Sequence, residues 1–381
     1  MDFGWDDADE QLYATIRHFA ESQLNAGLVE RERERAFPRA EWRRCGDFRL
    51  TGLSLPEALG GAGFGPLRTA HAFEALGRGC EDGGLVFSLG AHLFACAMPI
   101  AEHASEELKQ QLLPRLASGE WVGANAITEA GSGSDAFAMS TRAVREGDSY
   151  VLDGTKSFVT NAPVANVFLV YATTRPAYGH LGISAFALQR ETPGLVVGEA
   201  FRKVGLETSP MASIYLDGCR VPAAQRVGAE GAGATVFSNS MSWERTCLFA
   251  GYVGALDRQL EVCVQHARQR SQFGKPIGKH QAIAHRIADM KLRVEAARLL
   301  LYRACWLLER GDKALLEVAC AKLAVSEAAI RGGLDAIQIH GGSGIVSDTG
   351  VERMLRDALG STLFSGTSEI QRNIVAARLG L

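Results

Sequence analysis

The sequence predicts an α+β protein of 381 residues in which an N-terminal helical domain, a middle antiparallel β domain and a C-terminal four-helix bundle follow one another. Two observations predict this class. Apolar residues recur at helical spacing in the first and last parts of the chain, and short β-branched or aromatic runs fill the part between. Elements that come in blocks argue against a doubly wound sheet, in which strands and helices alternate. We expect a helical domain at 1–120, a β-barrel domain at 121–228 and a four-helix-bundle domain at 229–381.

The first domain is predicted to be helical because Leu12, Ile16, Phe19 and Leu24 repeat at the spacing of one helix face. Short runs rich in Gly and Pro, such as LPEALGGAGFGP at 55–66, separate its helices. The chain is therefore expected to begin with a helical bundle.

The middle domain is predicted to be a sheet because four runs alternate between apolar and polar residues and are bounded by turn residues. Such alternation is typical of antiparallel strands that bury one face. The four predicted strands lie at Ser149–Thr160, Asn166–Thr174, Gly182–Arg190 and Ser213–Pro222.

The last domain shows helical periodicity in three long segments, at 236–270, 281–311 and 315–342. A closing helix follows Gly366. Four helices of this kind, joined by short connections, predict a four-helix bundle.

The composition is that of an ordinary globular protein, with 47% apolar residues, 22% charged residues and a net charge of −3. This charge gives no reason to expect a nucleic acid or an anionic membrane as partner. The apolar stretch Leu85–Ala101 is short for a bilayer span and contains a His and a Pro. The acidic N-terminus lacks the basic and apolar segments of a signal peptide. Eight cysteines without a C-x-x-C pair predict a reduced, cytoplasmic protein without a metal site.

Five segments carry residue types suited to contact with a ligand. EELKQQLLPRLASGEWVGANAITEAGSGSDAFA at 106–138 ends in a loop whose small residues let backbone N–H groups approach an anionic ligand. ARQRSQFGKPIGKHQAI at 267–283 offers the guanidinium of Arg270 as a rigid fork for a pyrophosphate. LDAIQIHGGSG at 334–344 turns at paired glycines, and FSGTSEIQR at 364–372 opens a helix N-terminus, which favours phosphate. GTKSFVTNAP at 154–163 adds an aromatic side chain and a threonine.

Each of these segments also has a plain structural interpretation. The first is compatible with a Gly/Ser turn before a strand, and GTKSFVTNAP with a buried strand. The segment at 267–283 is compatible with a basic helix end closed by a Gly cap, because cations favour that terminus. His340 is interpreted as a packing residue rather than a catalytic one.

Together and in this order, the five segments resemble the acyl-CoA dehydrogenase family over essentially the whole chain. The family pattern K-x-x-x-L-P-x-L-x-x-G is matched, and its T-E-P-x-A-G-S-D reads TEAGSGSD here. Phe158 stands where the family has Trp, which keeps an aromatic wall but loses an indole N–H. The resemblance implies that FAD is bound by Asn125, Ile127, Thr128, Gly133, Ser134, Phe158, Val159, Thr160, Arg270, Gln272, Phe273, Gln281, Gln338, Ile339, Gly341, Gly342, Thr367 and Glu369.

The resemblance also implies an oligomer. In the family, the segment that carries Arg270 reaches the FAD of a neighbouring subunit, so FAD binding needs at least a dimer. Family members are usually tetrameric, and a homotetramer is expected here.

The catalytic base is expected at an unusual place. Most family members remove the substrate proton with the Glu of a Y-E-G-T sequence, but here the aligned residues are Phe364, Ser365, Gly366 and Thr367. A serine carries no usable negative charge near neutral pH. A minority of the family, the isovaleryl-CoA type among them, places the Glu before an Arg on an earlier helix. This chain has MSWERTCLFAG there, and the resemblance implies that Glu244 is the base, although a surface Glu in a helical charge pair is the alternative.

The resemblance is sharper than family level. FSLGAHLFACAMPI at 87–100, KSFVTNAP, LYRACW and FSGTSEIQ look like the prolyl carrier-protein dehydrogenases of pyrrole natural-product biosynthesis, a class of secondary (antibiotic) metabolism. These enzymes oxidise proline, held as a thioester on a peptidyl carrier protein, to the pyrrole-2-carboxyl thioester. The resemblance implies a substrate site, for which we expect Ser134, Ser242, Arg245, Phe364, Ser365 and Gly366.

Several functions stay open on the sequence alone. The chain resembles short- and branched-chain acyl-CoA dehydrogenases that use the same base, with an electron-transfer flavoprotein as acceptor; oxygen is the other acceptor to consider. A flavoprotein without turnover is suggested by Ser365, and a flavin-dependent ring closure on a carrier-bound amino acid is a further alternative.

Overall fold

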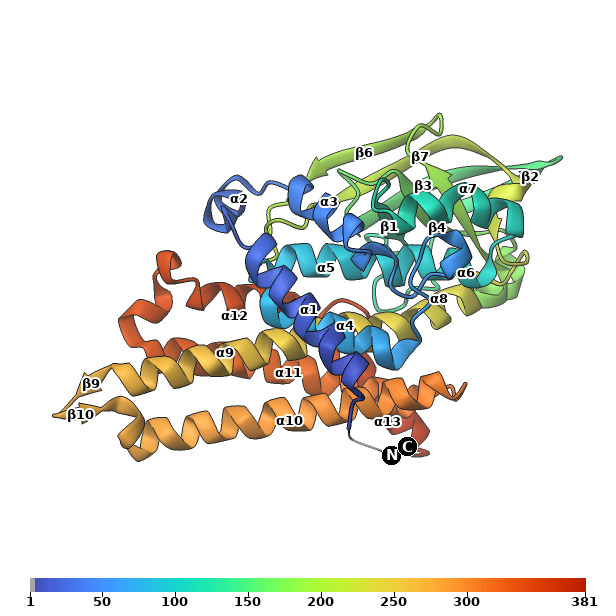
Figure 1. The fold of residues 1–381 in the computed structure, drawn as a ribbon. Helices are drawn as coiled ribbons and strands as arrows, with labels where there is room; N and C mark the ends of the chain where they lie inside the picture. Colours follow the sequence, from blue (N-terminus) through green and yellow to red (C-terminus); the bar gives the residue numbers. More distant parts are fainter. Residues whose placement is uncertain (1–3) are drawn as a thin grey trace.

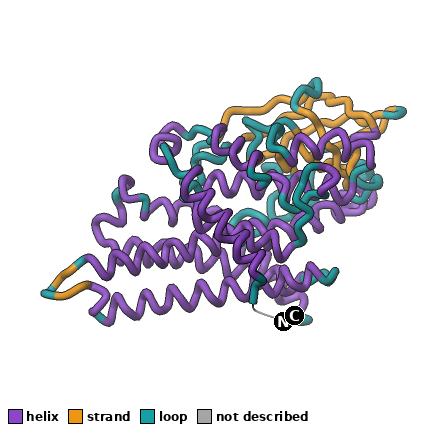
Figure 2. The backbone as a smooth tube through the Cα atoms, in the orientation of Figure 1, coloured by secondary structure: helices purple, strands orange, loops and turns teal. Residues whose placement is uncertain are grey.

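The protein consists of a helical part, a sheet and a second helical part in chain order, as the computed structural model of residues 4–381 shows (Figure 1). Helices and strands are separated in space: the strands of the large sheet gather at one end, and a short two-stranded hairpin at 271–276 lies at the other (Figure 2). This arrangement confirms the predicted α+β class. The first helical part contains α1 (Asp7–Gln23), α2 (Leu28–Glu34), α3 (Arg39–Asp47), α4 (Pro66–Gly79), α5 (Gly83–His92), α6 (Met98–His103) and α7 (Glu106–Ala117).

Polar side chains fix where several of these helices begin. The Asp82 carboxylate accepts a hydrogen bond from the Leu85 N–H at 2.9 Å and caps α5, and Ser105 caps α7 in the same way. The stretch from α5 to α6, Gly83–His103, is long and apolar enough to cross a membrane, but 89% of its most apolar window is buried inside the structure. It is a core helix, as its short apolar run predicts.

The middle part is one mixed sheet whose pairing order is β6-β7-β3-β2-β4-β5-β8, with β1 paired to β4. The four predicted strands are present as β3, β4, β5 and β7, and the shorter β1, β2, β6 and β8 were not predicted. Two expectations need correction. β1 and β2 run parallel to β4, and the pairing path has two separate ends instead of closing into a barrel. The strands are β1 (Gly123–Ala126), β2 (Arg142–Glu146), β3 (Ser149–Thr160), β4 (Val167–Thr173), β5 (Ile183–Gln189), β6 (Leu195–Ala200), β7 (Met211–Pro222) and β8 (Arg226–Val227).

The last part contains the expected long helices and one more, α12. Helices α9, α10 and α11 pack side by side, and α11 also contacts α12 and α13. The N-terminal α4 packs on α9 and α10, so the bundle takes a helix from the first part of the chain. These helices are α8 (Gly233–Trp243), α9 (Phe249–Gln269), α10 (Gln281–Glu309), α11 (Leu315–His340), α12 (Val351–Leu359) and α13 (Ser368–Arg378).

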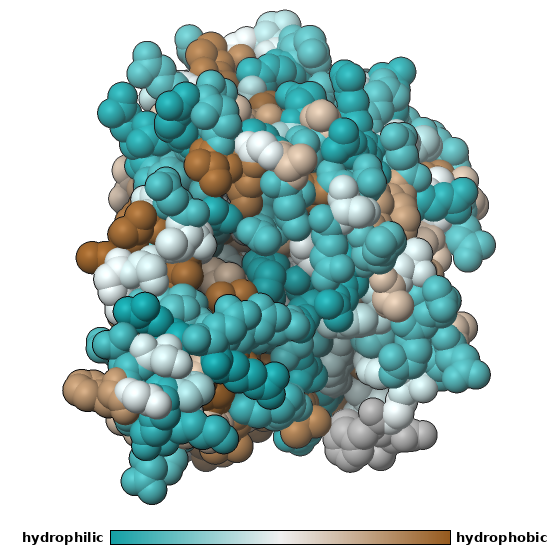
Figure 3. Space-filling model, turned by 60° about the vertical axis from the view of Figure 1, so that its left-hand side comes forward, coloured by the Kyte–Doolittle hydropathy of each residue, from teal (hydrophilic) through white to brown (hydrophobic). Residues whose placement is uncertain are grey.

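A short hairpin of β9 (Ser271–Gln272) and β10 (Lys275–Pro276) joins α9 to α10 and projects beyond the helix ends at the left of Figure 1. The face that Figure 3 shows is mainly hydrophilic, with small separate apolar patches. Within residues 4–381 every cysteine is a free thiol, and seven of them are buried.

One large hydrophobic core joins the two helical parts and reaches the sheet. It contains Phe73 of α4, Phe94, Phe249 of α9 and Tyr171 of β4. The opposite side of the sheet has its own core, with Phe168 and Phe186. Burial on both faces makes β4 a continuous apolar strand at the centre of the molecule.

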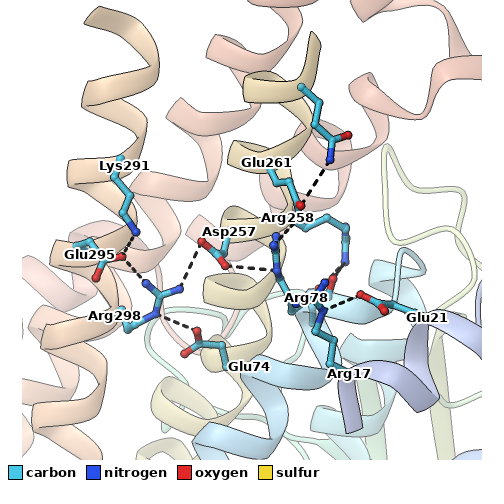
Figure 4. A network of polar contacts seen from close by, with 12 residues as sticks. Arg17, Glu21, Glu74, Arg78, Asp257, Arg258, Glu261, Lys291, Glu295 and Arg298 are labelled. Carbon is cyan, nitrogen blue, oxygen red and sulfur yellow. Dashed lines mark hydrogen bonds and ion pairs between the residues drawn. The ribbon is translucent and has the colours of Figure 1, made fainter. Parts of the chain in front are cut away.

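A network of charged side chains ties α4 to the bundle (Figure 4). The Glu74 carboxylate of α4 accepts hydrogen bonds from Arg298 Nε at 2.9 Å and from the Tyr302 hydroxyl at 2.7 Å, both on α10. Asp257 of α9 bridges Arg298 and Arg78. Only 3% of Glu74 is exposed, so its carboxylate depends on these partners.

We expect Glu74→Ala to lower the free energy of unfolding by about 2 kcal/mol, because it removes the buried acceptor shared by Arg298 Nε and the Tyr302 hydroxyl, although Arg298 keeps Glu295 and Asp257 as partners. Denaturation by urea, followed by circular dichroism, measures the change. The matched control is Glu21→Ala, which breaks an exposed pair with Arg17 and should cost less than about 1 kcal/mol. Equal destabilisation by the two changes would contradict the assigned role of Glu74.

Candidate active site

Glu244 begins a π-helical stretch, Glu244–Leu248, that joins α8 to α9. Such widened turns are rare and occur frequently at functional sites, because the extra residue changes the direction of the side chains. A second π-helical stretch, Leu93–Ala97, joins α5 to α6 and contacts the first one. The rings of Phe94 and Trp243 lie parallel across this contact, with 6.2 Å between their centroids.

The Glu244 carboxylate is buried and only partly hydrogen-bonded. One oxygen, Oε2, accepts a hydrogen bond from the Ser365 hydroxyl at 2.9 Å. The other, Oε1, is buried without a partner among residues 4–381. Burial raises the pKa of Glu244 to about 7, although the Ser365 hydroxyl and the Arg245 charge oppose the shift. Glu244 is therefore not a surface Glu, which removes that alternative.

Ser365 has a strained backbone conformation that neighbouring side chains hold in place. Its φ of 54° lies in the left-handed region, which is unfavourable for a serine and persists only when neighbours hold it. Two side chains do so: Arg245 Nε donates to the Ser365 carbonyl at 2.8 Å, and Gln371 Nε2 donates to it at 3.3 Å. The Ser365 hydroxyl is thereby directed at Glu244, although the two residues lie 121 positions apart.

Aromatic rings close the site beside Ser365. The ring of Phe364 lies 4.5 Å from the ring of Phe87 on α5. It also lies 5.5 Å from Phe249 and 6.2 Å from Tyr252, both on α9. Three segments that are distant in the sequence thus form one wall next to the carboxylate.

Tyr171 of β4 carries a second buried polar atom near Glu244. Its hydroxyl lies in the core without a hydrogen-bond partner among the described residues. Burial and the nearby Glu244 charge both raise its pKa. A row of ring contacts connects Tyr171 through Phe237 and Phe137 to His180 in the connection between β4 and β5. Unpaired buried atoms on both Tyr171 and Glu244 mark a place for a polar ligand.

The loop after β1 is anchored by a dry ion pair. Lys156 Nζ of β3 donates to Glu129 Oε1 at 2.8 Å and to the Ile127 carbonyl at 3.1 Å. The Thr141 N–H also donates to the Glu129 carboxylate, at 2.9 Å. These bonds fix a loop that contains many of the expected FAD contacts, including Thr128, whose carbonyl accepts the Ser157 N–H at 2.8 Å.

The residues around this loop fit a flavin. A Cβ at Gly131 or Gly133 would meet no heavy atom within 4 Å, so the loop borders open space. The Asn125 amide oxygen is buried and has no partner within residues 4–381. Phe158 is 59% exposed and has a left-handed φ of 56°. An unpaired acceptor and an uncovered ring are what a planar, hydrogen-bonding cofactor would complete.

The structure modifies two expected FAD contacts. Val159 is buried in the core of the sheet and Ile339 is buried in a small helical cluster, so neither side chain is available to a ligand. Only their backbone atoms remain. A register shift between Lys156 and Val159 interrupts the regular alternation of β3, so Phe158 points outward with its left-handed φ and Val159 points inward.

The expected FAD residues form two groups that one chain does not bring together. The loop after β1 and Phe158–Thr160 belong to the sheet, on the right in Figure 1. The β9–β10 hairpin and the end of α11 lie at the opposite, left-hand end. Phe273 at the tip of the hairpin is 94% exposed. This second group contains Arg270, Gln272, Phe273, Gln281, Gln338, Ile339, Gly341 and Gly342.

The remaining predicted contacts lie at the start of α13, in α8 and in the loop after β1. Thr367 caps α13, its hydroxyl accepting from the Ile370 N–H at 3.3 Å, and Glu369 is exposed in the first helical turn. Ser242 lies half-buried one turn before Thr246, whose hydroxyl bonds to its carbonyl at 2.6 Å, and Ser134 lies exposed in the loop after β1. Their contacts with substrate or cofactor stay predictions.

Sequence reasoning missed several residues of the site. Phe87, Tyr171, Tyr252 and Gln371 were not predicted, although Phe87 lies in a segment that carried the resemblance. No local pattern identifies Phe87, Tyr171 and Tyr252, because each meets the site through a long-range contact, whereas Gln371 lies six residues from Ser365 in a segment that carried the resemblance. The sequence offered one signal for these residues: Tyr171 places a polar hydroxyl in an otherwise apolar central strand.

Comparison with known proteins accounts for this arrangement. The acyl-CoA dehydrogenase N-terminal domain matches residues 6–120, the middle domain matches residues 124–219, and the C-terminal domain matches residues 231–380. The chain is similar to an L-prolyl-[peptidyl-carrier protein] dehydrogenase of Pseudomonas fluorescens, with 51% identity over 382 residues and 100% of each chain covered. A protein of the same name from Serratia sp. is 42% identical, with 100% of this chain and 99% of the relative covered.

A solved structure gives the same result. PigA with FAD and proline superposes on the chain with a TM-score of 0.98 and 42% identity, and 100% of both chains is covered. Three consecutive domain matches and full-length relatives well above 30% identity leave one conclusion. The chain belongs to the acyl-CoA dehydrogenase family.

Proposed function

We propose that the protein is an FAD-dependent oxidoreductase that oxidises an L-prolyl thioester on a peptidyl carrier protein to the pyrrolyl-2-carboxyl thioester. The observation that carries the proposal is the buried Glu244 carboxylate, hydrogen-bonded to a serine that stands where most of the family has its base. Full-length similarity to two L-prolyl-[peptidyl-carrier protein] dehydrogenases supports the substrate.

Glu244 is the base that removes the proton from the substrate carbon next to the thioester carbonyl. Its free Oε1 has the lone pairs that accept this proton. A pKa of about 7 keeps much of the carboxylate ionised near neutral pH and still makes it a far stronger base than an exposed Glu. When bound, FAD supplies the acceptor for the hydride that leaves the adjacent ring atom.

Converting the pyrrolidine ring to a pyrrole removes four hydrogens and four electrons, so two rounds of oxidation are needed. In each round Glu244 takes one proton and the one electron pair that is removed leaves as a hydride, so the hydride acceptor must be regenerated between the two rounds. Ser365 and Arg245 keep the carboxylate at one place throughout both rounds. Oxygen or an electron-transfer flavoprotein then reoxidises the enzyme.

The separation of the two groups of expected FAD residues supports a homo-oligomer. Residues of the sheet and residues of the β9–β10 hairpin lie at opposite ends of one chain. An FAD held by the sheet of one copy would meet Arg270 of another copy, which would supply a rigid fork for the pyrophosphate. We propose a tetramer built from such pairs.

The proposed substrate is tested by anaerobic mixing of the FAD-loaded protein with prolyl-loaded carrier protein, in which the absorbance of oxidised flavin should bleach. Isovaleryl-CoA and butyryl-CoA are offered in parallel. Bleaching by the CoA esters and not by the carrier substrate would overturn the proposal in favour of a short- or branched-chain acyl-CoA dehydrogenase. No bleaching by any of the three would favour a flavoprotein with altered chemistry.

Glu244→Gln should lower the rate of flavin bleaching by about 10³-fold, because an amide keeps the shape of the side chain but cannot accept the proton. Stopped-flow absorbance measures the rate. Glu102→Gln is the matched control: Glu102 accepts a hydrogen bond from Trp243 Nε1 at 2.8 Å, beside the same helix, and an amide oxygen can replace it. This control should stay within about twofold of the parent. Full activity in Glu244→Gln would exclude Glu244 as the base.

The bleaching rate should rise with pH and level off above about 7, because only ionised Glu244 accepts a proton. Below that pH, each further pH unit should lower the bleaching rate about tenfold. Ser365→Ala removes a hydrogen bond that stabilises the ionised form, so it should move the pKa, and with it the rising limb, upward by about one unit. Stopped-flow rates between pH 5.5 and 9 decide this. A limb that stays in place or moves to lower pH would refute the role of Ser365.

A further inference from the structure

The aromatic wall beside Glu244 borders a cavity. Phe364 precedes Ser365, whose hydroxyl contacts the carboxylate, and its ring meets that of Phe87 at 4.5 Å. Behind this ring pair lies a cavity of about 200 Å³ between α4, α5, α9 and α12. Phe87 and Tyr252 line the cavity, whereas Phe364, Ser365 and Glu244 do not.

The side of the cavity nearest the wall is apolar. Beyond Phe87 it continues along Val86, Leu248 and Gly251. Its charged members make most of their contacts within the chain, although the Nε atoms of Arg258 and Arg353 have no hydrogen-bond partner among residues 4–381. Arg258 donates to the Cys80 carbonyl at 2.6 Å, and Asp357 accepts the Leu206 N–H at 2.5 Å. What remains for a ligand is therefore mainly hydrocarbon surface.

We propose that Phe87 and Phe364 form a partition that limits the acyl group to the size of a five-membered ring. The partition excludes longer acyl chains, which would otherwise extend from the Glu244 site into the cavity. This inference rests on the proposed function, because it assumes that the acyl group lies beside Glu244. Two side chains, Phe87 of α5 and Phe364 of the segment before α13, then determine the preference for a small ring.

Physical reasoning gives the direction of the effect. Truncating Phe87 to Ala removes one of the two rings in contact and joins the two spaces, because a well-packed core refills only part of such a void. An acyl chain that enters the apolar side then gains affinity by roughly fourfold per buried methylene. In the parent, the same methylenes meet the Phe87 and Phe364 rings.

The test uses the FAD-loaded protein and one carrier protein loaded with prolyl, butyryl, hexanoyl or octanoyl groups, so that carrier docking is constant. Anaerobic flavin bleaching is measured for Phe87→Ala, for the milder Phe87→Leu and for the parent. The ratio of octanoyl to butyryl efficiency should rise at least about tenfold in Phe87→Ala and less in Phe87→Leu. Phe19→Ala, which removes a half-buried ring stacked on Phe48 at 4.1 Å, is the matched control and should leave the ratio unchanged.

The outcomes separate the partition from the function. A folded Phe87→Ala protein with an unchanged ratio overturns the partition, and so does an equal rise in Phe19→Ala. If Phe87→Ala does not fold, a ratio in Phe87→Leu equal to that of the parent overturns it. Loss of prolyl bleaching in the parent overturns the proposed function alone, because the butyryl and octanoyl rates still measure the partition.

Discussion

The burial of one carboxylate is the constraint on which the site depends. Glu244 lies inside the core that joins both helical parts to the sheet, and removing it from water is what raises its pKa to about 7. A buried charge without partners would neutralise itself or unfold its surroundings. The Ser365 hydroxyl and the Arg245 guanidinium reduce this penalty just enough to leave a strong but ionisable base.

That environment requires the rest of the fold to be rigid. Glu244 comes from a widened helical turn, Ser365 from a strained turn before α13, and Phe87 from α5. Packing of α4 on α9 and α10, together with the Glu74 network in Figure 4, holds these helices in register. On the sheet side, the Glu129–Lys156 pair does the same for the loop after β1. These charged pairs are not part of the site itself, which consists of aromatic rings and a few unpaired polar atoms beside Glu244.

Much of this could be predicted from the sequence, and the limits have physical reasons. Periodicity identified the long helices and four strands, because each is a local pattern. The short strand β8 and the parallel pairing of β1 depend on partners far away in the chain. The residues of β1 and β8 do not by themselves reveal these partners. The same holds for the site. The tetrapeptide around Ser365 and the Glu-Arg pair predicted a base at Glu244, and this role stays a prediction. No pattern shows that Ser365 bonds to Glu244, or that Val159 turns inward.

The contact between Ser365 and Glu244 explains why the two positions differ together from the commoner family pattern. A carboxylate at position 365 would lie within hydrogen-bonding distance of the Glu244 carboxylate, and two like charges in a buried site cannot both ionise. One of them would hold a proton at neutral pH, and the pair would titrate as a unit rather than as one base. A serine at position 365 removes this repulsion and contributes a donor to the remaining carboxylate. The buried carboxylate at position 244 and the hydroxyl at position 365 are therefore two parts of one electrostatic arrangement.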